Sequence, residues 1–348
     1  MHTPQLHKAG LLCLLLLAGF LAAWEGYWRS QGFTPTFNDD KALWAGKRKE
    51  AYITPEKGTV FIGSSRIKFD LDIPTWQALT GEKAVQLSLV GTSPLELLKD
   101  LAADERFRGK LVVDITEVLF FSRNPVFHQS AQEALHFYRK STPSEQVSAR
   151  IQHVLEGKLA FLEERRFALT ALLNEWELPD RPGVFTVPAF PKGFEWTTAD
   201  RQTYMSDLFL SNPEDLRRQT DIWQKLILGD PTPAPAGQAL EEILNEVKAA
   251  VDQIRSRGGR VLFVRTPSSG PMAVAEEQKY PRTQYWEALL QHTGAPGLHF
   301  RDFPETAGLV CPEWSHLAPA DAVHYTRALV QQLQEHRWFT HPHSATQP

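Results

Sequence analysis

The chain has 348 residues, 42% of them hydrophobic and 22% charged, which is enough for one large α/β domain or two small ones. Its formal net charge is −4 and no dense run of Lys and Arg is present, so we set nucleic-acid binding aside. The two cysteines, Cys13 and Cys311, lie far apart in the sequence and predict no disulfide framework.

Residues 1–29 predict an N-terminal membrane anchor. Residues 9–24 carry no charge, and Tyr27 and Trp28 follow them, a pattern typical of a membrane helix with an aromatic belt at one end. The alternative is a signal-peptide core. Cleavage after Ala22 or Ala23 would put a bulky residue three positions upstream, where small residues are expected, so a retained anchor is favoured.

Charge around this segment predicts its orientation. Lys8 precedes the apolar run, whereas Glu25 partly offsets Arg29 after it. Because the positive side faces the cytoplasm, the prediction is a single-pass protein of the inner (cytoplasmic) membrane with its soluble domain on the periplasmic or extracytoplasmic side. Residues 30–57 then form a connector, with an extended lead and a short helix that Asn38 or Asp39 would cap.

Five short apolar segments rich in β-branched residues predict buried strands. They span residues 59–62, 84–89, 110–115, 260–265 and 298–303. A helix is predicted over 239–254, with apolar residues on one face and Gly258 and Gly259 at its end. Helices alternating with strands predict a doubly wound, five-stranded, mostly parallel sheet of the flavodoxin-like type, built from residues 58–121 and 236–340.

Residues 122–235 interrupt this alternation. They contain long helical patterns and then a loop rich in Pro and aromatic residues at 178–196. The segment is too long for a connection, so it predicts an inserted helical subdomain or lid. The polar tail, 341–348, is expected to fray.

The ends of the predicted strands carry the candidate chemistry, because ligands of open parallel sheets bind outside the carboxyl ends of the strands. Ser65 follows the first strand, and a serine hydroxyl attacks only when a base takes its proton. His316, before a helix opened by Pro319, is the candidate base, and Glu313 three residues earlier would orient it. Taken singly, Ser65 also fits a small-residue turn, and His316 a capping or core residue.

Asp321 and His324 are a rival pair with the same three-residue spacing. Both fall inside the predicted helix, where Asp321 is better explained as a first-turn acid favoured by the helix dipole.

These features together resemble the SGNH (GDSL-type) esterase family. The resemblance rests on Gly63-Ser64-Ser65 after the first strand, Gly91 after the second, and an acidic residue three before His316. Residues 316–326, HLAPADAVHYT, are similar to the closing block of the family. The match covers residues 58–123 and 258–335 and leaves the insertion unexplained. The N-terminal lead resembles membrane-anchored envelope members of the family that are related to polysaccharide O-acylation.

The resemblance implies that Ser65 is the nucleophile, His316 its base and Glu313 the residue that orients the base. It also implies that the amides of Ser65 and Gly91 bind the oxyanion, each such donor being worth about 3 to 4 kcal/mol. Where the family usually has an Asn after the third strand, this chain has Thr116, the candidate substitute. Ser64 and Glu313 both replace residues that are usually Asp in the family.

Arg66 and Arg265 are candidate binders of an anionic or sugar-bearing substrate. The alternative is that each pairs with Asp70 or Asp114 to balance charge.

The resulting hypothesis is a serine esterase or O-acyltransferase acting on acyl groups, acetyl foremost, of an exported or cell-envelope glycan. It would need no cofactor and no metal, and a membrane-bound acyltransferase is a candidate partner. The second hypothesis is a catalytically inactive SGNH-fold binding or scaffold protein in a polysaccharide modification or export system, which the absent Asn and Ser64 favour. A purely structural membrane protein is the third.

Overall fold

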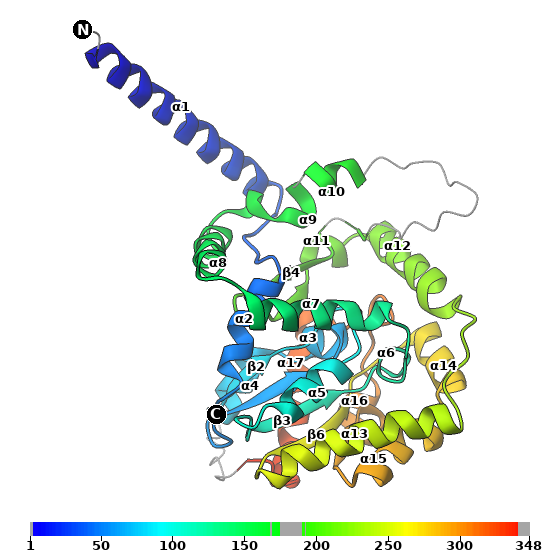
Figure 1. The fold of residues 1–348 in the computed structure, drawn as a ribbon. Coiled ribbons are helices and arrows are strands. Elements are labelled where there is room, and N and C mark those ends of the chain that lie inside the picture. The colour runs from blue at the N-terminus through cyan, green and yellow to red at the C-terminus, as the bar shows by residue number, and fades with distance from the viewer. Residues whose placement is uncertain (1–2, 168, 175–189, 192, 340–348) are drawn as a thin grey trace.

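The computed structural model describes residues 3–167, 169–174, 190–191 and 193–339 (Figure 1). Its centre is a five-stranded, all-parallel sheet with the strand order β2-β1-β3-β6-β7. The strands are β1 (Gly58–Ile62), β2 (Lys83–Gln86), β3 (Lys110–Asp114), β6 (Arg260–Arg265) and β7 (Gly297–His299). All five predicted strands are therefore present, and the α/β class and the parallel sheet are confirmed.

The ends of β2 and β7 differ most from the prediction. β2 ends at Gln86 and β7 at His299, both earlier than the apolar pattern indicated. After β7 the chain turns into the 3-10 helix η4 (Phe300–Asp302), where the amide of Arg301 donates to Nδ1 of His299 at 3.1 Å. This local hydrogen bond turns the chain out of the strand although Phe300 and Phe303 are apolar.

Helices cover both faces of the sheet, as a buried parallel sheet requires. Val60 and Ile62 of β1 share a core with α5 (Leu95–Ala103) and α13 (Gln238–Ser256). Phe61, on the opposite face, shares a core with α4 (Ile73–Thr80) and α17 (Pro319–Glu335). The alternation of side chains along a strand thus separates two cores.

The helix predicted over 239–254 corresponds to α13. It ends as glycines end helices, with Gly258 at φ +85° and the amide of Gly259 donating to the Ile254 carbonyl at 3.1 Å.

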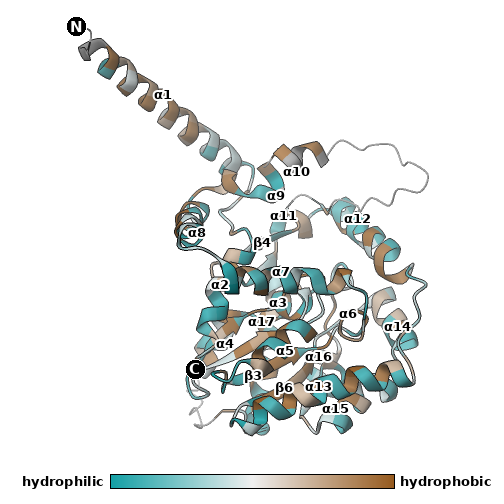
Figure 2. Cartoon of the chain, viewed as in Figure 1, coloured by the Kyte–Doolittle hydropathy of each residue, from teal (hydrophilic) through white to brown (hydrophobic). Residues whose placement is uncertain are grey.

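An N-terminal helix, α1 (Thr3–Ser30), projects from the rest of the molecule and is hydrophobic along most of its length (Figure 2). Its segment Leu6–Ser30 is long and apolar enough to span a membrane, and none of its residues is buried. The predicted apolar helix is therefore present, whereas the membrane that it enters and the side on which the domain lies stay predictions.

The connector contains α2 (Lys41–Glu50), and its cap is Asp40, whose Oδ1 accepts from the amides of Ala42 and Leu43 at 3.0 and 2.8 Å. The prediction that Asn38 or Asp39 caps this helix was wrong. Tertiary contacts occupy both side chains: Asn38 donates to Glu156 at 2.7 Å, and Asp39 forms ion pairs with buried Lys68 and Arg201.

The insertion begins with α7 (Val126–Lys140), which packs on the α/β core through buried Ala131, Ala134 and Leu135. It continues through α8 (Pro143–Glu156), η1 (Ala160–Leu162), α9 (Glu164–Phe167), α10 (Leu169–Asn174), α11 (Asp207–Leu210), α12 (Pro213–Trp223) and the π-helix η2 (Gln224–Leu228). It also holds an unpredicted antiparallel pair, β4 (Glu195–Thr197) and β5 (Thr203–Met205), too short to leave a periodic pattern. Most of the Pro-rich loop and the tail 341–348 lie outside the described residues.

The remaining elements connect these layers. They are α3 (Ser65–Asp70), α6 (Glu117–Phe120), α14 (Gly270–Lys279), η3 (Thr283–Glu287), α15 (Ala288–Thr293) and α16 (Pro304–Ala307).

Gly63, directly after β1, tests how closely the chain approaches the end of β3. A methyl group on residue 63 would lie 2.6 Å from Cβ of Asp114 and 2.7 Å from Cγ2 of Ile67. We expect Gly63→Ala to lower the free energy of unfolding by about 1–3 kcal/mol, because neither neighbour can give way without moving backbone. Thermal unfolding in detergent measures this change.

The matched control is Gly46→Ala in the exposed middle of α2, where nothing lies within 4 Å of the added methyl group. There the substitution should raise stability by up to about 1 kcal/mol, because alanine favours helix. Equal melting temperatures for the two variants would contradict the prediction.

Candidate active site

Ser65 is the first residue of α3, directly after β1 and Gly63-Ser64. Its hydroxyl Oγ lies 2.8 Å from Nε2 of His316, although the two residues are 251 positions apart in the sequence. The β1–α3 turn carries the serine, and the loop before α17 carries the histidine. Because Gly63 has no side chain, Asp114 and Ile67 can pack directly against the backbone at this turn.

Glu313 completes a chain of three side chains. Its Oε1 lies 3.0 Å from Nδ1 of His316 and also accepts from the backbone amides of His316 and Ser315, at 2.6 and 3.3 Å. The backbone amides of the loop therefore hold the Glu313 carboxylate next to the imidazole of His316. Nucleophile, base and orienting acid are thus within hydrogen-bond reach in the order that nucleophilic catalysis requires.

Trp223, the last residue of α12, donates its indole N–H to Oε2 of Glu313. The sequence analysis missed this residue, because a tryptophan in a long insertion carries no spacing signal that relates it to His316. Burial by itself raises the pKa of Glu313, but the adjacent imidazole and the hydrogen bonds from His316 and Trp223 outweigh it, so the pKa lies below its usual range. Both carboxylate oxygens are used, which suits an ionised glutamate.

Aromatic rings enclose the imidazole of His316. Phe69 of α3 stacks on it with a centroid distance of 4.3 Å, and Phe194 and Trp223 of the insertion lie 6.1 Å away. Phe69 and Phe194 are themselves buried in a small core with Phe209. The insertion therefore forms part of the wall of the site, which limits the access of water to the base.

The candidate oxyanion donors differ in their surroundings. Gly91, in the loop between β2 and α5, is exposed, with φ +61° and nothing within 4 Å of an added Cβ, so its backbone has open space around it. Thr116 is buried, and its hydroxyl donates to Oδ2 of Asp114 at 3.3 Å and lies 2.6 Å from Oγ of Ser64. The Thr116 hydroxyl thus already has two hydrogen-bond partners, and its role as an oxyanion donor stays a prediction.

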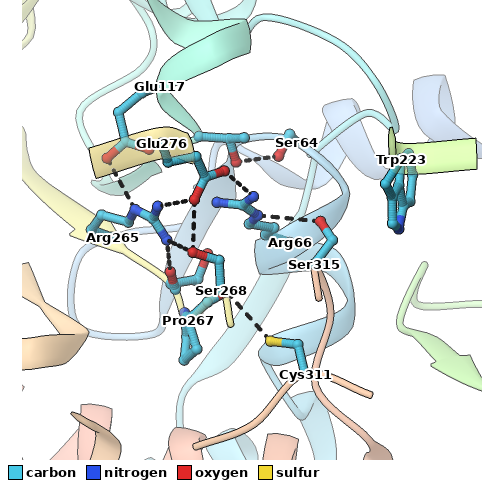
Figure 3. Close-up of polar contacts among 12 residues, drawn as sticks. Ser64, Arg66, Glu117, Trp223, Arg265, Pro267, Ser268, Glu276, Cys311 and Ser315 are labelled. Atoms are coloured by element: carbon cyan, nitrogen blue, oxygen red, sulfur yellow. Dashed lines mark hydrogen bonds and ion pairs between the residues drawn. The ribbon is translucent and has the colours of Figure 1, made fainter. Parts of the chain in front are cut away.

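Arg66 and Arg265 lie in a buried ion-pair network below the site (Figure 3). Arg265 contacts Glu276 at 2.5 Å and Glu117 at 3.0 Å, and Arg66 pairs with the same Glu276. The side chains of Arg66 and Arg265 are only 2% and 5% exposed, so their placement gives no support to the predicted substrate-binding role. Neither residue pairs with Asp70 or Asp114, the partners that the alternative named.

The network has a positioning effect on the site. Nε of Arg66 also contacts Oγ of Ser315 at 3.4 Å, which links the residue after the candidate nucleophile to the residue before the candidate base. Burial would raise the pKa of Glu276, but the guanidinium groups of Arg66 and Arg265 lower it to about 2. The carboxylate therefore stays ionised and keeps both arginines in place.

Asp70, the last residue of α3, also holds the histidine loop. Its Oδ1 accepts from the amide of Leu317 at 2.9 Å, while its buried Oδ2 has no hydrogen-bond partner in the described part of the chain. Burial raises the pKa of this carboxyl well above its usual range.

The rival pair lies elsewhere. Asp321 and His324 are on α17, as predicted, and Nε2 of exposed His324 lies 3.0 Å from the carbonyl of Glu305. Among the described residues, no group of three or more His, Cys, Asp or Glu side chains could hold a metal ion.

Comparison with protein-family models found no match, and comparison with curated proteins found none either. The functional interpretation therefore rests on the geometry of the chain itself.

Trp223→Phe tests the contact between the insertion and Glu313. Phenylalanine keeps most of the ring but removes the donor, and a hydrogen bond to a charged group is typically worth about 1.5–3 kcal/mol. We expect labelling of Ser65 by a fluorophosphonate, which reacts with activated serine hydroxyls, to slow about tenfold or more.

Trp196→Phe is the matched control, because Trp196 belongs to the same insertion and stacks on Tyr204 at a centroid distance of 4.7 Å. It should label at the rate of the unmodified protein. Equal rates for the two tryptophan variants would show that the indole contact has no influence on Ser65.

Asp70→Asn tests the state of the buried carboxyl. Because its folded pKa is raised above the unfolded value of about 3.9, the ionised form destabilises the fold increasingly as pH rises above about 4. Asparagine keeps the acceptor for Leu317 and carries no charge. The variant should therefore melt at a higher temperature than the unmodified protein at about pH 8, and the gain should vanish near about pH 4. A lower melting temperature at the higher pH would mean that the carboxylate is ionised and stabilising.

Proposed function

We propose that this chain is an SGNH-like, membrane-anchored serine esterase or O-acyltransferase acting on acyl groups, acetyl foremost, of an exported or cell-envelope glycan. The observation that carries the proposal is the chain of hydrogen bonds from Ser65 Oγ through His316 to Glu313, at 2.8 and 3.0 Å. The first contact joins residues 251 positions apart, and the second orients the histidine from within its own loop; together they favour a nucleophile over a small-residue turn.

The reaction follows from this geometry. Oγ of Ser65 attacks the acyl carbonyl while Nε2 of His316 takes its proton, and Glu313 stabilises the imidazolium through the Nδ1–H hydrogen bond. The proton passes to the departing alcohol, which leaves an acyl group on Ser65. Water or a sugar hydroxyl then attacks this ester, His316 takes the proton of the attacking group, and Ser65 is released with its proton restored.

The backbone amides of Ser65 and Gly91 are the proposed oxyanion donors. With the Thr116 hydroxyl bonded to Asp114, these two amides carry the whole task in this proposal. Because one such donor contributes about 3–4 kcal/mol, a site with two is expected to be slower than one with three, yet active.

The strand order supports the finer fold assignment. If the strands of this sheet are numbered one to five along the chain, so that β6 and β7 are the fourth and fifth, their spatial order is 2-1-3-4-5. This is the order of doubly wound flavodoxin-like sheets. Ser65 follows the strand at the reversal of winding, where such folds bind ligands.

The location and partners in this proposal rest on α1 and on the resemblance. A helix long and apolar enough to cross a membrane supports a single-pass anchor. We propose the cytoplasmic membrane, an extracytoplasmic soluble domain, and a membrane-bound acyltransferase as the source of acyl groups.

Fluorophosphonate labelling of the full chain tests the proposal. We expect one label, on Ser65, located by peptide mass spectrometry, and its loss in Ser65→Ala. In His316→Ala the rate should fall by about three orders of magnitude or more, since the hydroxyl loses its base.

Ser64→Ala is the control, because the Ser64 hydroxyl contacts Thr116 and not His316. It should keep the label. Labelling that persists in Ser65→Ala, or an unmodified chain that does not react, would remove the enzymatic proposal.

Acceptor dependence separates hydrolysis from transfer. For a transferase, a glycan acceptor should speed the breakdown of the acyl-enzyme and receive the acyl group. Unchanged turnover would identify a hydrolase.

The second candidate function is an inactive SGNH-fold scaffold that holds glycan or an acyltransferase partner. The engaged Thr116 hydroxyl favours it, because the third oxyanion donor is then missing. A scaffold should support polysaccharide modification with Ser65→Ala and fail when the insertion is trimmed, whereas the enzyme should fail with Ser65→Ala.

A further inference from the structure

Helix α8 turns its polar face toward the protein. Glu156 is 1% exposed and accepts hydrogen bonds from Asn38 and Gln152, both at 2.7 Å, and His153 faces Asp40 at 3.7 Å. The contacts with Asn38 and Asp40 attach the helix to the connector through polar side chains, while the bond between Gln152 and Glu156 lies within α8. Hydrophobic contacts, which attach most surface helices of globular proteins, are not the main link here.

The opposite face of α8 is apolar and exposed. Val147, Ile151, Val154 and Leu155 are 53%, 59%, 60% and 45% exposed. Their spacing of i, i+4, i+7 and i+8 places them in one stripe along the helix. An apolar stripe that points away from the protein indicates an interaction surface.

The segment that directly follows α8 contacts the end of α1. The carboxylate of Glu25 accepts from the amides of Ala160 and Phe161 at 2.9 and 3.3 Å, and Arg29 donates to the carbonyl of Lys158 at 2.8 Å. The two amides and the carbonyl belong to residues 158–161, directly after α8 ends at Glu156. The 3-10 helix η1, which follows α8, packs against both α8 and α1.

The aromatic residues of α1 indicate the depth of this contact. Trp24 stacks on Tyr27, and Tyr27 meets Trp28 edge to face. Trp28 also contacts Phe167 of α9 with a centroid distance of 4.7 Å. Such aromatic belts lie at the headgroup level of a membrane. The segment after α8 therefore touches α1 at that level.

We propose that the apolar stripe of α8 lies in the headgroup region of the membrane that α1 enters, as an interfacial amphipathic helix. Arg150 and Lys158, both exposed, flank the stripe and suit anionic lipid headgroups. A lipid surface is favoured over a protein partner because the segment after α8 contacts α1 at the level at which α1 meets the bilayer. This inference depends on α1 crossing the membrane and is independent of the chemistry at Ser65.

A second attachment would fix the tilt of the catalytic domain. One spanning helix alone leaves the domain free to rotate about its exit point, whereas a second helix lying in the interface restrains that rotation. The domain would then hold Ser65 at one height and direction relative to the lipid surface.

The experiment uses the full chain with Cys13→Ser, reconstituted as one copy per lipid nanodisc. An environment-sensitive fluorophore is attached to Ile151→Cys, and to Val274→Cys as the control, since Val274 of α14 is a comparable exposed residue at 56%. Cys311 is buried and stays in place. Because both labelled residues are exposed, the substitutions should leave the melting temperature unchanged.

At residue 151 we expect blue-shifted emission, strong quenching by lipids with a nitroxide near the headgroup, and iodide quenching several-fold weaker than at residue 274. Equal iodide quenching at the two positions would overturn the proposal. So would protection that appears only when several copies share a vesicle, because that result would identify a second copy of the chain as the occupant.

Discussion

The hydrogen bond between Ser65 and His316 is the contact on which the proposed chemistry depends, and it joins the first and last parts of the α/β domain. At 2.8 Å it requires that two remote loops hold their positions to within a fraction of an ångström. Two contacts restrain the histidine loop: Asp70 accepts from Leu317, and Arg66 reaches Ser315. Both restraining residues belong to α3, the helix that begins with Ser65. The candidate nucleophile and the loop of the candidate base are therefore both held by one short helix.

The buried charges around Arg66 and Arg265 are better understood as a positioning device than as a source of stability. Burying ion pairs costs desolvation energy that their attraction roughly offsets, so such pairs contribute little net stability. Removing one partner, however, leaves an uncompensated charge. Glu276 thus connects α3, β6 and α14 in a single arrangement, beneath the edge of the sheet where the serine lies.

The insertion is part of the candidate site as well as a cover for it. Trp223 donates to Glu313, and Phe194 lies against His316, so the orientation and the surroundings of the base both depend on this segment. Glu313 is one methylene longer than the aspartate that the proposed SGNH-like assignment would lead one to expect, and the indole of Trp223 binds its second oxygen. The same insertion contacts the end of α1 through Ala160 and Phe161, which connects the surroundings of the base with the membrane-proximal end of the molecule.

The sequence by itself determined the five strands, the apolar N-terminal helix, α13 and the residues that meet at the site, because periodicity, strand ends and local spacing are properties of neighbouring residues. Tertiary structure decided the rest. Asp40, not Asn38 or Asp39, caps α2, since the latter two are drawn into contacts with the insertion and with buried cations. Arg66 pairs with Glu276, and Arg265 pairs with Glu276 and Glu117. The Thr116 hydroxyl contacts Ser64 and Asp114. Partners separated by up to hundreds of residues leave no periodic trace, so only the folded chain brings Trp223 to Glu313 or shows which face of α8 is exposed.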